Sequence, residues 1–367
     1  MPPLQPVLRQ VGMSADARRL HRATVDPVKA NEFPVGRRAG CRSGDNCAMA
    51  IEGFGHGIYA VDSGYVRPQF DAIHLLVHRS RVAIVDTATR RSVPAVMAAL
   101  EELGLQPTQV DYVLLTHVHL DHAGGAGALL QRLPNAVLTV HPRGERHMID
   151  PTQLWSATAQ IYGSEQAEQM YGEPVPVPAE RIVQTPEGAT VALAGRTLEF
   201  FDTPGHARHH VVIRDTHTGH LFTGDTFGVS YREFDIDGRA FIFPASTPTQ
   251  FDAAALQRSI DRILLLAPEA VYLTHYAQVR DVPRLGARMK HLIDCYAEIA
   301  LAATGQGADR LQQIEPAMTQ LLTDELRAHG VGWPEERIRQ MLDADIRLNS
   351  AGLLDWLDSR DRYEAAR

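Results

Sequence analysis

The sequence THVHLDHAGG, Thr116–Gly125, places three imidazoles and a carboxylate on one short stretch of chain. In an extended loop successive side chains point to opposite sides, so His117, His119 and Asp121 share one side and His122 faces another. Imidazole nitrogens and carboxylate oxygens are ordinary ligands of divalent metal ions. The stretch therefore predicts that one loop supplies ligands to two adjacent metal sites.

Three further residues of ligand type each lie at the end of a strand-like run. They are His206 in FFDTPGHA, Asp225 in LFTGDT and His275 in VYLTHY. Rigid scaffolds commonly present functional side chains on loops at such positions. Together with the first four residues they are enough for two metal ions of roughly four to five ligands each, with a place left for solvent.

The runs around the loop alternate between strand and helix patterns. Runs rich in β-branched and aromatic residues predict strands, and SVPAVMAALEELG predicts a helix between Ser92 and Gly104. The strand pattern VDYVLLT then leads directly into the ligand loop. A second set of strands is predicted in ATVAL, RTLEFFDT, HVVIRD and HLFTGD. Strands followed by helices occur twice, which predicts two β-rich halves covered by helices.

Composition divides the chain into three parts. Residues 1–50 are rich in Arg, Pro and Gly and lack periodicity, so we expect an extension that lies outside the main fold and need not be ordered. A downstream translation start near Met49 is the alternative interpretation. Residues 51–282 form the predicted catalytic domain. Residues 283–367 predict amphipathic helices, which either cover the mouth of the active site or form the interface of a homo-oligomer.

Overall composition narrows the class of protein. The 367 residues are 44% hydrophobic and 22% charged, as in globular proteins. The formal net charge of −8 and the lack of a dense basic run argue against a nucleic-acid partner. Cys41, Cys47 and Cys295 form no repeated metal-binding pattern, and no run approaches the ~18 apolar residues of a membrane span. We expect a cytoplasmic protein without a signal peptide that acts on a small molecule.

The motifs THVHLDH, PGHA, TGD and LTHY, in this order, resemble the metallo-β-lactamase-fold superfamily over about residues 55–280. The resemblance implies an α/β fold, an αββα sandwich of two mixed β-sheets flanked by helices, with the metals in a groove at one edge. Residues 283–367 then form a C-terminal helical extension. It also implies a ligand set, with the first metal held by His117, His119 and His206, the second by Asp121, His122 and His275, and Asp225 bridging them.

The resemblance further implies supporting residues and a mechanism. Asp86 and Thr116 lie behind the ligands, where a carboxylate orients imidazoles. Two cations that share a bridging solvent lower its pKa and make it a hydroxide nucleophile. Asp121 is the expected catalytic carboxylate, because it lies near that nucleophile without bridging. We therefore expect two zinc ions, with iron or a mixed iron and zinc pair as alternatives, and hydrolysis of an ester, thioester or lactone.

Departures from related families bear on the substrate. True metallo-β-lactamases are exported and lack the bridging aspartate, whereas this chain has Asp225. Acyl-homoserine lactonases often carry a tyrosine three residues beyond that aspartate, where Gly228 stands, and Tyr231 is the nearest substitute. Glyoxalase II is similar in having helices after the last ligand. The nucleases of the superfamily fit poorly with the net negative charge.

Two other classes of activity remain open. Persulfide dioxygenases of the superfamily use one iron at positions that match His117, His206 and Asp225. A di-iron oxygen-binding centre is related to this, although flavodiiron proteins usually have glutamate where His119 stands. A non-catalytic metal core that binds a small molecule predicts a closed groove and no turnover. Ligand types alone do not separate zinc from iron.

The substrate pocket is expected from large side chains near the ligands. The segment between His122 and His206 is longer than a bare connection, and inserted loops beside a metal site commonly wall a pocket. Arg208 either meets an anionic substrate group or forms a surface salt bridge. The candidate pocket residues are His147, Trp155, Tyr162, Arg208, Phe227, Tyr231 and Tyr276.

Overall fold

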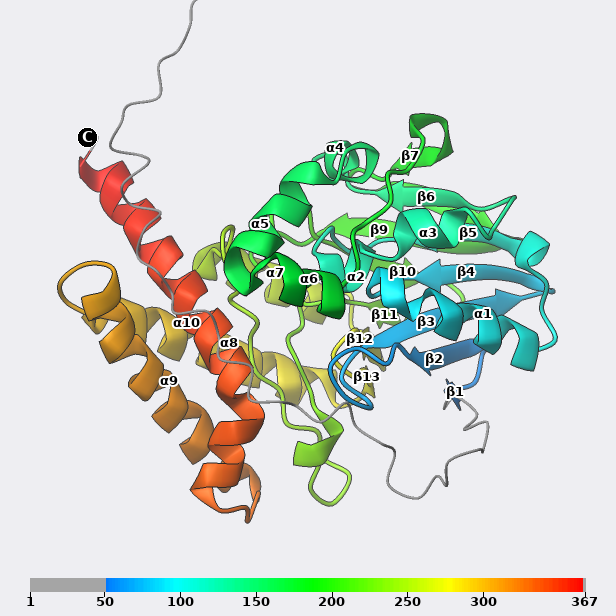
Figure 1. Cartoon of the computed structure of the whole chain (residues 1–367). Coiled ribbons are helices and arrows are strands. Elements are labelled where there is room, and N and C mark those ends of the chain that lie inside the picture. The colour runs from blue at the N-terminus through cyan, green and yellow to red at the C-terminus, as the bar shows by residue number, and fades with distance from the viewer. Residues whose placement is uncertain (1–50, 366–367) are drawn as a thin grey trace, which may run out of the picture.

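The computed structural model describes residues 51–365, so the predicted extension over residues 1–50 lies outside the described residues. Two β-sheets pack against each other, and helices cover their outer faces (Figure 1). Both sheets mix parallel and antiparallel pairs. The predicted αββα sandwich with a C-terminal helical part is confirmed.

The first sheet comes from the N-terminal half of the described chain and has the strand order β1-β2-β3-β4-β5-β6-β7. Its first four strands pair antiparallel and the last four pair parallel. The strands are β1 Ile51–Gly53, β2 Ile58–Asp62, β3 Ala72–His78, β4 Arg81–Val85, β5 Val110–Leu114, β6 Val137–Val140 and β7 Ile182–Gln184.

The second sheet follows in sequence and has the order β13-β12-β11-β10-β9-β8. Only β11 and β12 pair in parallel within it. The strands are β8 Thr190–Leu193, β9 Arg196–Asp202, β10 Val211–Asp215, β11 Leu221–Phe222, β12 Val271–Leu273 and β13 Ala277–Val279.

Helices lie on both sides of the sheets, and α8, α9 and α10 form a layer beside the second sheet (Figure 1). None of the helices described between residues 51 and 365 combines the length and apolar character needed to cross a bilayer. The helices are α1 Val93–Glu102, α2 Leu120–Ala123, α3 Ala126–Leu130, α4 Glu145–Ile149, α5 Thr152–Tyr162, α6 Ser164–Met170, α7 Ala253–Leu265, α8 Val282–Ala302, α9 Ala308–His329 and α10 Glu335–Ala365.

Alternating apolar side chains explain why the sheets pack on both faces. In β4, Val82 and Ile84 point toward the helices that cover the first sheet, whereas Ala83 and Val85 point between the sheets. This is the period of two expected for a strand buried on both faces. Phe200 of β9 belongs to the same inter-sheet cluster, so the two sheets share one apolar layer.

The C-terminal helices pack on the outer face of the second sheet. One apolar cluster joins Val212 and Leu273 of the strands with Met289 of α8 and Leu342 of α10. α10 lies close to the chain at Ser246, where a Cβ on Gly352 would meet the Ser246 carbonyl oxygen at 1.6 Å. The helices therefore cover the sandwich, and the predicted domain division near residue 282 stays a prediction.

Some local expectations differ from the structure. The run GIYAVDSGYV, residues 57–66, has the β-branched and aromatic residues of a strand, but β2 ends at Asp62. Residues 63–71 form a connection in which Gly64 has a positive φ. The sequence analysis does not predict β7 and β13, which are short strands of three residues each.

A buried ion pair fixes the β9 to β10 hairpin. Asp215 accepts two hydrogen bonds from Arg196, at 2.8 and 2.6 Å, and Arg196 also donates to the His56 carbonyl at 2.6 Å. Removing one partner leaves the other charge buried and unpaired. We expect Asp215→Ala to lower the free energy of unfolding by about 3–5 kcal/mol, measured by urea denaturation.

The matched control lies on the same two strands. Glu199 pairs with Arg214 at 3.6 Å, and both side chains are about one third exposed. Because exposed pairs contribute little, Glu199→Ala should change the unfolding free energy by only about 0–1 kcal/mol. Equal losses in the two variants would contradict the role given to the buried pair.

Candidate metal centre

The structure brings all seven predicted ligands together at the ends of strands. The loop of residues 116–122 follows β5, His206 follows β9, Asp225 follows β11 and His275 follows β12. In each of three groups the donor atoms lie within 4.8 Å of one another. The groups are His117, His119 and His206; His117, His122 and Asp225; and Asp121, His122 and His275.

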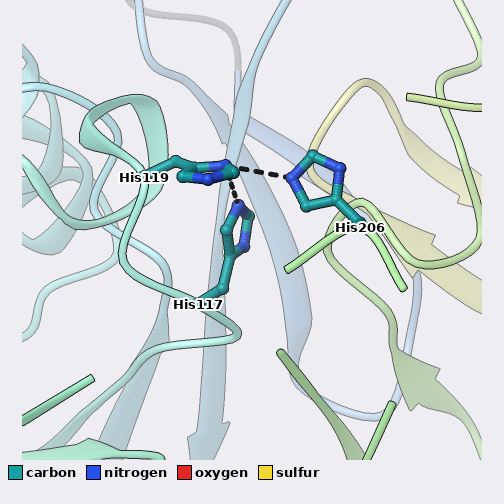
Figure 2. Close-up of side chains that lie close together, drawn as sticks. All are labelled: His117, His119 and His206. Carbon is teal, nitrogen blue, oxygen red and sulfur yellow. Dashed lines mark hydrogen bonds between the residues drawn. The ribbon is translucent and has the colours of Figure 1, made fainter. Parts of the chain in front are cut away.

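The first group consists of imidazoles alone. Figure 2 shows the rings of His117 and His206 pointing toward His119, whose Nδ1 lies 3.0 Å from Nε2 of each. The Nδ1 of His206 donates to the Ala245 carbonyl at 2.9 Å. That bond places the proton on Nδ1 and leaves Nε2 with a free lone pair toward the group. The arrangement suits a cation rather than a set of mutual hydrogen bonds.

The group of Asp121, His122 and His275, called the second group below, combines two imidazoles and a carboxylate. Nε2 of His275 and Nε2 of His122 lie 3.6 and 3.9 Å from the same Asp121 oxygen. His275 donates from Nδ1 to the Phe70 carbonyl at 3.0 Å, so its Nε2 also faces the group. Asp121 is about one quarter exposed, which leaves it accessible from the site opening.

Asp225 lies between the two groups. One of its carboxylate oxygens is 3.5 Å from Nε2 of His206, and the other is 3.3 Å from Nε2 of His122 and 3.7 Å from Nε2 of His275. The two oxygens therefore face opposite groups. Gly224 permits this placement, since it has a φ of +45° and a Cβ there would meet Thr116 Oγ1 at 2.5 Å.

Unpartnered buried atoms test whether this donor set fits a metal. Nε2 of His122 and Oδ1 of Asp225 are buried and have no hydrogen-bond partner. Burying polar atoms without partners costs free energy, and a cation between them would satisfy both. The residues present therefore fit divalent metal ions, and the assignment of individual ligands stays a prediction.

Asp86 supports the ligands from behind. Its carboxylate accepts hydrogen bonds from the Thr116 backbone N–H at 2.9 Å, from Thr116 Oγ1 at 2.8 Å and from Thr274 Oγ1 at 3.0 Å. It also lies 2.9 Å from Nδ1 of His122. A carboxylate at Nδ1 fixes the ring so that Nε2 faces the metal groups. The positions of Asp86 and Thr116 agree with the predicted supporting role.

Protonation differs between the two groups. Burial lowers the pKa of His119 to about 3 and lowers the pKa of His206 as well. Burial also disfavours charge on His122, but Asp225 and Asp121 raise its pKa well above the ordinary value. His275 follows the same pattern, and its pKa rises to about 9. The first group is thus neutral, whereas the second holds protons.

A buried carboxyl near the site was missed from the sequence. Asp71 is fully buried, neither of its oxygens has a hydrogen-bond partner, and burial raises its pKa to about 8. Its strongest electrostatic neighbours are His275 and His122. No local pattern marks Asp71, because it directly precedes β3 and belongs to none of the recognised motifs.

Aromatic side chains form one wall beside the second group. Trp155 and Tyr162 of α5 pack around a small cluster made by Tyr65, Leu120 and Tyr171. Phe70 continues this wall. Its ring lies 5.2 Å from that of His275 and stacks on Tyr231 at 5.3 Å, and Tyr231 donates to Asp345 of α10 at 2.8 Å.

Two predicted pocket residues lie in the core. Phe227 is fully buried in the apolar cluster that includes Met289, and Tyr276 is 1% exposed and packs with Ala60 and Ala72. These contacts do not favour a pocket role for Phe227 and Tyr276, and that role stays a prediction. Closeness in sequence to a ligand does not set the direction of a side chain.

The remaining two candidates line a large cavity beside His206. His147 and Arg208 belong to its wall, and its volume is about 1070 Å³. The end of α10 closes it with Asp355, Trp356 and neighbouring residues. α10 also holds Ser246 through Asn349, at 2.6 Å from the Ser246 backbone N–H. These contacts favour the covering role of the C-terminal helices, and the predicted homo-oligomer stays a prediction.

Comparison with known proteins identifies the family. A family model described as "Metallo-beta-lactamase superfamily" matches residues 68–275, which is more than half of the chain. The chain therefore belongs to the metallo-beta-lactamase superfamily. The matched residues include the whole predicted ligand set and the strands from β3 to β12.

Individual relatives are distant. The chain is 25% identical over 230 residues to the metallo-beta-lactamase fold-containing protein ST1585 of Sulfurisphaera tokodaii, which covers 60% of this chain and 78% of that protein. It is 31% identical over 144 residues to a hydroxyacylglutathione hydrolase of Synechococcus sp. and 32% identical over 165 residues to one of Stenotrophomonas maltophilia. These matches cover 38% and 44% of this chain, but only 45% and 46% of the two hydrolases.

Solved structures agree on the fold. The crystal structure of ST1585 superposes with a TM-score of 0.57 at 21% identity and covers 81% of this chain and 98% of that chain. The metallo-beta-lactamase family protein TTHA1429 of Thermus thermophilus gives a TM-score of 0.56 at 22% identity, with coverage of 83% and 94%. At this identity the likeness concerns the fold alone.

The hydrogen bond that Asp86 accepts from Nδ1 of His122 yields a test. Asp86→Asn keeps the shape of the side chain but replaces one acceptor oxygen with a donor. We expect the affinity for the second metal ion to fall roughly 10- to 100-fold, measured by competition with a chromophoric chelator. Asp111→Asn, which changes a surface carboxylate paired with Arg81, is the control. An unaltered affinity in Asp86→Asn would refute the orienting role.

The protonation difference yields a second test. Both His122 and His275 carry protons at neutral pH without metal, because their pKa values are raised, so an ion must displace these protons. Affinity for the second ion should therefore rise with pH until it passes the His275 pKa of about 9. The first ion should bind with little pH dependence, since the His119 pKa is about 3. Calorimetry in buffers of different ionisation enthalpy counts the released protons, and a count of zero for both ions contradicts the assignment.

Proposed function

We propose that this member of the superfamily is a metal-dependent hydrolase that cleaves an ester, thioester or lactone bond of a small molecule. The position of Asp225 carries the proposal. Its two oxygens face different ligand groups, 3.5 Å from His206 on one side and 3.3 Å from His122 on the other. A carboxylate in that position can be shared by two metal ions held close together.

The clusters of donor atoms in the candidate metal centre indicate which residues would hold each metal ion. His117, His119 and His206 would hold one ion, and Asp121, His122 and His275 the other, with Asp225 common to both. Bound there, two such ions would polarise a substrate carbonyl and lower the pKa of bound solvent. We propose zinc for both, because an imidazole-rich set with carboxylates suits it.

Asp121 has the freedom that proton transfer requires. Its side chain is about one quarter exposed, whereas Asp225 is 6% exposed and enclosed by histidines. Burial alone would raise the pKa of Asp121, but His122 and His275 lower it to about 2, so the carboxylate is ionised. It can accept a hydrogen bond from the attacking water and then pass the proton toward the leaving group.

The relatives support the bond type within this proposal. Two of them are named hydroxyacylglutathione hydrolases, and that activity belongs to those proteins. We extend to this chain only the cleavage of a thioester or a chemically similar acyl bond. Hydrolysis of the same acyl group from an oxygen ester and from a thioester compares the two bond types directly.

Substitution of Asp121 tests the proposed chemistry. Asp121→Asn should lower kcat for thioester hydrolysis by roughly 10²- to 10⁴-fold, the usual contribution of a general acid or base. Metal content per chain, measured on the same samples, separates lost proton transfer from a lost ion. Asp237→Asn removes one charge from an exposed turn and serves as the control. Wild-type kcat in Asp121→Asn would remove Asp121 from the mechanism.

Metal analysis decides between the proposal and its alternatives. About two zinc ions per chain with acyl-bond hydrolysis supports the hydrolase. About one iron per chain, with oxygen consumption and no hydrolysis, would replace it with iron chemistry at His117, His206 and Asp225. Bound metal without turnover of any activated ester would leave a non-catalytic binding protein.

A further inference from the structure

A cavity beside the proposed metal centre gathers positively charged side chains. Its wall combines the segment after β6, the turn that carries His206, the segment that leads into α7 and the last turns of α10. Four arginines contribute from these separate segments. They are Arg143, Arg146, Arg208 and Arg360.

Three of these arginines are not neutralised by carboxylates. Among residues 51–365, no salt bridge involves Arg143, Arg146 or Arg208, although the chain as a whole carries a formal charge of −8. Instead, Arg143 donates to the Arg208 carbonyl at 3.2 Å and Arg146 donates to Nε2 of His147 at 3.2 Å. These bonds hold the guanidinium groups in place and leave their charge available.

The acidic residues of the cavity do not cancel this charge. Asp252 accepts a hydrogen bond from the Ala255 backbone N–H at 2.8 Å and caps α7. Asp355 of α10 is the other carboxylate in the wall, so two carboxylates stand against four arginines. The cavity is thus a concentration of positive charge on an acidic protein, and such a site attracts anions.

His209 connects the cavity with the metal centre. It lines the cavity and is 5% exposed, and its Nδ1 has no hydrogen-bond partner. Its ring centroid lies 6.0 Å from that of His119 and 6.2 Å from that of His117. Buried polar atoms normally have partners, so an unpartnered Nδ1 in this wall indicates a polar ligand. With its proton on Nδ1, the ring can donate a hydrogen bond to an anionic oxygen.

We propose that the cavity is a substrate subsite for a polyanionic group, such as phosphate, on the part of the substrate remote from the bond that is cleaved. Guanidinium groups bind phosphate and carboxylate oxygens through paired hydrogen bonds. The volume of about 1070 Å³ exceeds the needs of a single small anion and suits a large leaving group. The inference rests on the proposed hydrolase function and adds a substrate class to it.

Three thioesters of one acyl group test the substrate class. Acyl-coenzyme A carries phosphates, S-acylglutathione carries carboxylates, and the acyl N-acetylcysteamine thioester is neutral. We expect kcat/KM for the phosphate-bearing substrate to exceed that for the neutral one by roughly tenfold or more. The reason is that the phosphates, unlike the neutral thioester, can accept charged hydrogen bonds from the arginines of the cavity. A preference for the glutathione thioester instead would reassign the site to carboxylates. Equal kcat/KM values for the three thioesters would overturn the proposed anion subsite. Hydrolysis of any of them would still support the proposed hydrolase function.

Variants of exposed arginines assign the preference to the cavity. Arg146→Gln combined with Arg208→Gln should lower the ratio of kcat/KM for the anionic substrate over the neutral one roughly tenfold or more, mainly through KM. Arg132→Gln, an exposed arginine outside the cavity, should leave the ratio unchanged. Arg208→Gln alone provides a second variant in case the double variant unfolds. An unaltered ratio in a folded variant contradicts the proposal.

Binding of inorganic pyrophosphate supplies a readout that does not depend on turnover. Calorimetry should show weaker binding to the double variant than to the wild type or to Arg132→Gln. If no thioester is hydrolysed but this difference is present, the proposed function fails and the anion site stands. If pyrophosphate binds the wild type and the double variant equally, the anion site fails whatever the activity.

Discussion

The carboxylate of Asp86 is the constraint on which the site depends. It receives hydrogen bonds from Thr116, which follows β5 of the first sheet, and from Thr274, which follows β12 of the second. It also orients His122 at 2.9 Å. One buried side chain therefore ties the ends of both sheets to a metal ligand. Because buried networks of this kind are costly when incomplete, a shift of either sheet would disturb the ligand loop.

The two ligand groups differ because their neighbours differ. In the imidazole group burial is the main cause that lowers the pKa of His117 and His119, and the charge of the neighbouring His122 lowers both further. In the other group Asp121 and Asp225 lie within 4 Å of His122, and their charge outweighs burial. Without metal this group stabilises itself as a set of charged contacts. The same fold thus presents one site that is ready for a cation and one in which a cation replaces protons.

The features that could be predicted from the sequence are those marked by a local pattern of residues. The motif of residues 116–122 and the strand ends at His206, Asp225 and His275 could be recognised, because each ligand follows a strand pattern directly. Asp345 could not, since it meets Tyr231 only through the packing of α10, 114 positions away. Phe227 lies two positions after Asp225, yet its side chain packs in the apolar core, a direction that the sequence does not show. The fold was therefore predictable to a larger extent than the pocket.

The pocket is built from segments that share no sequence signal. Arg143 follows β6, Arg208 follows β9 and Trp356 belongs to α10, and only tertiary packing brings them to one cavity. Gly352 permits that packing, because a larger residue would collide with the Ser246 carbonyl and push the end of α10 away. Under the proposed function, the sandwich would fix the reacting centre, while the C-terminal helix and two loops would fix what can reach it. We therefore expect sequence changes in α10 to alter the proposed substrate preference without touching a ligand, since none of the predicted ligands lies on that helix.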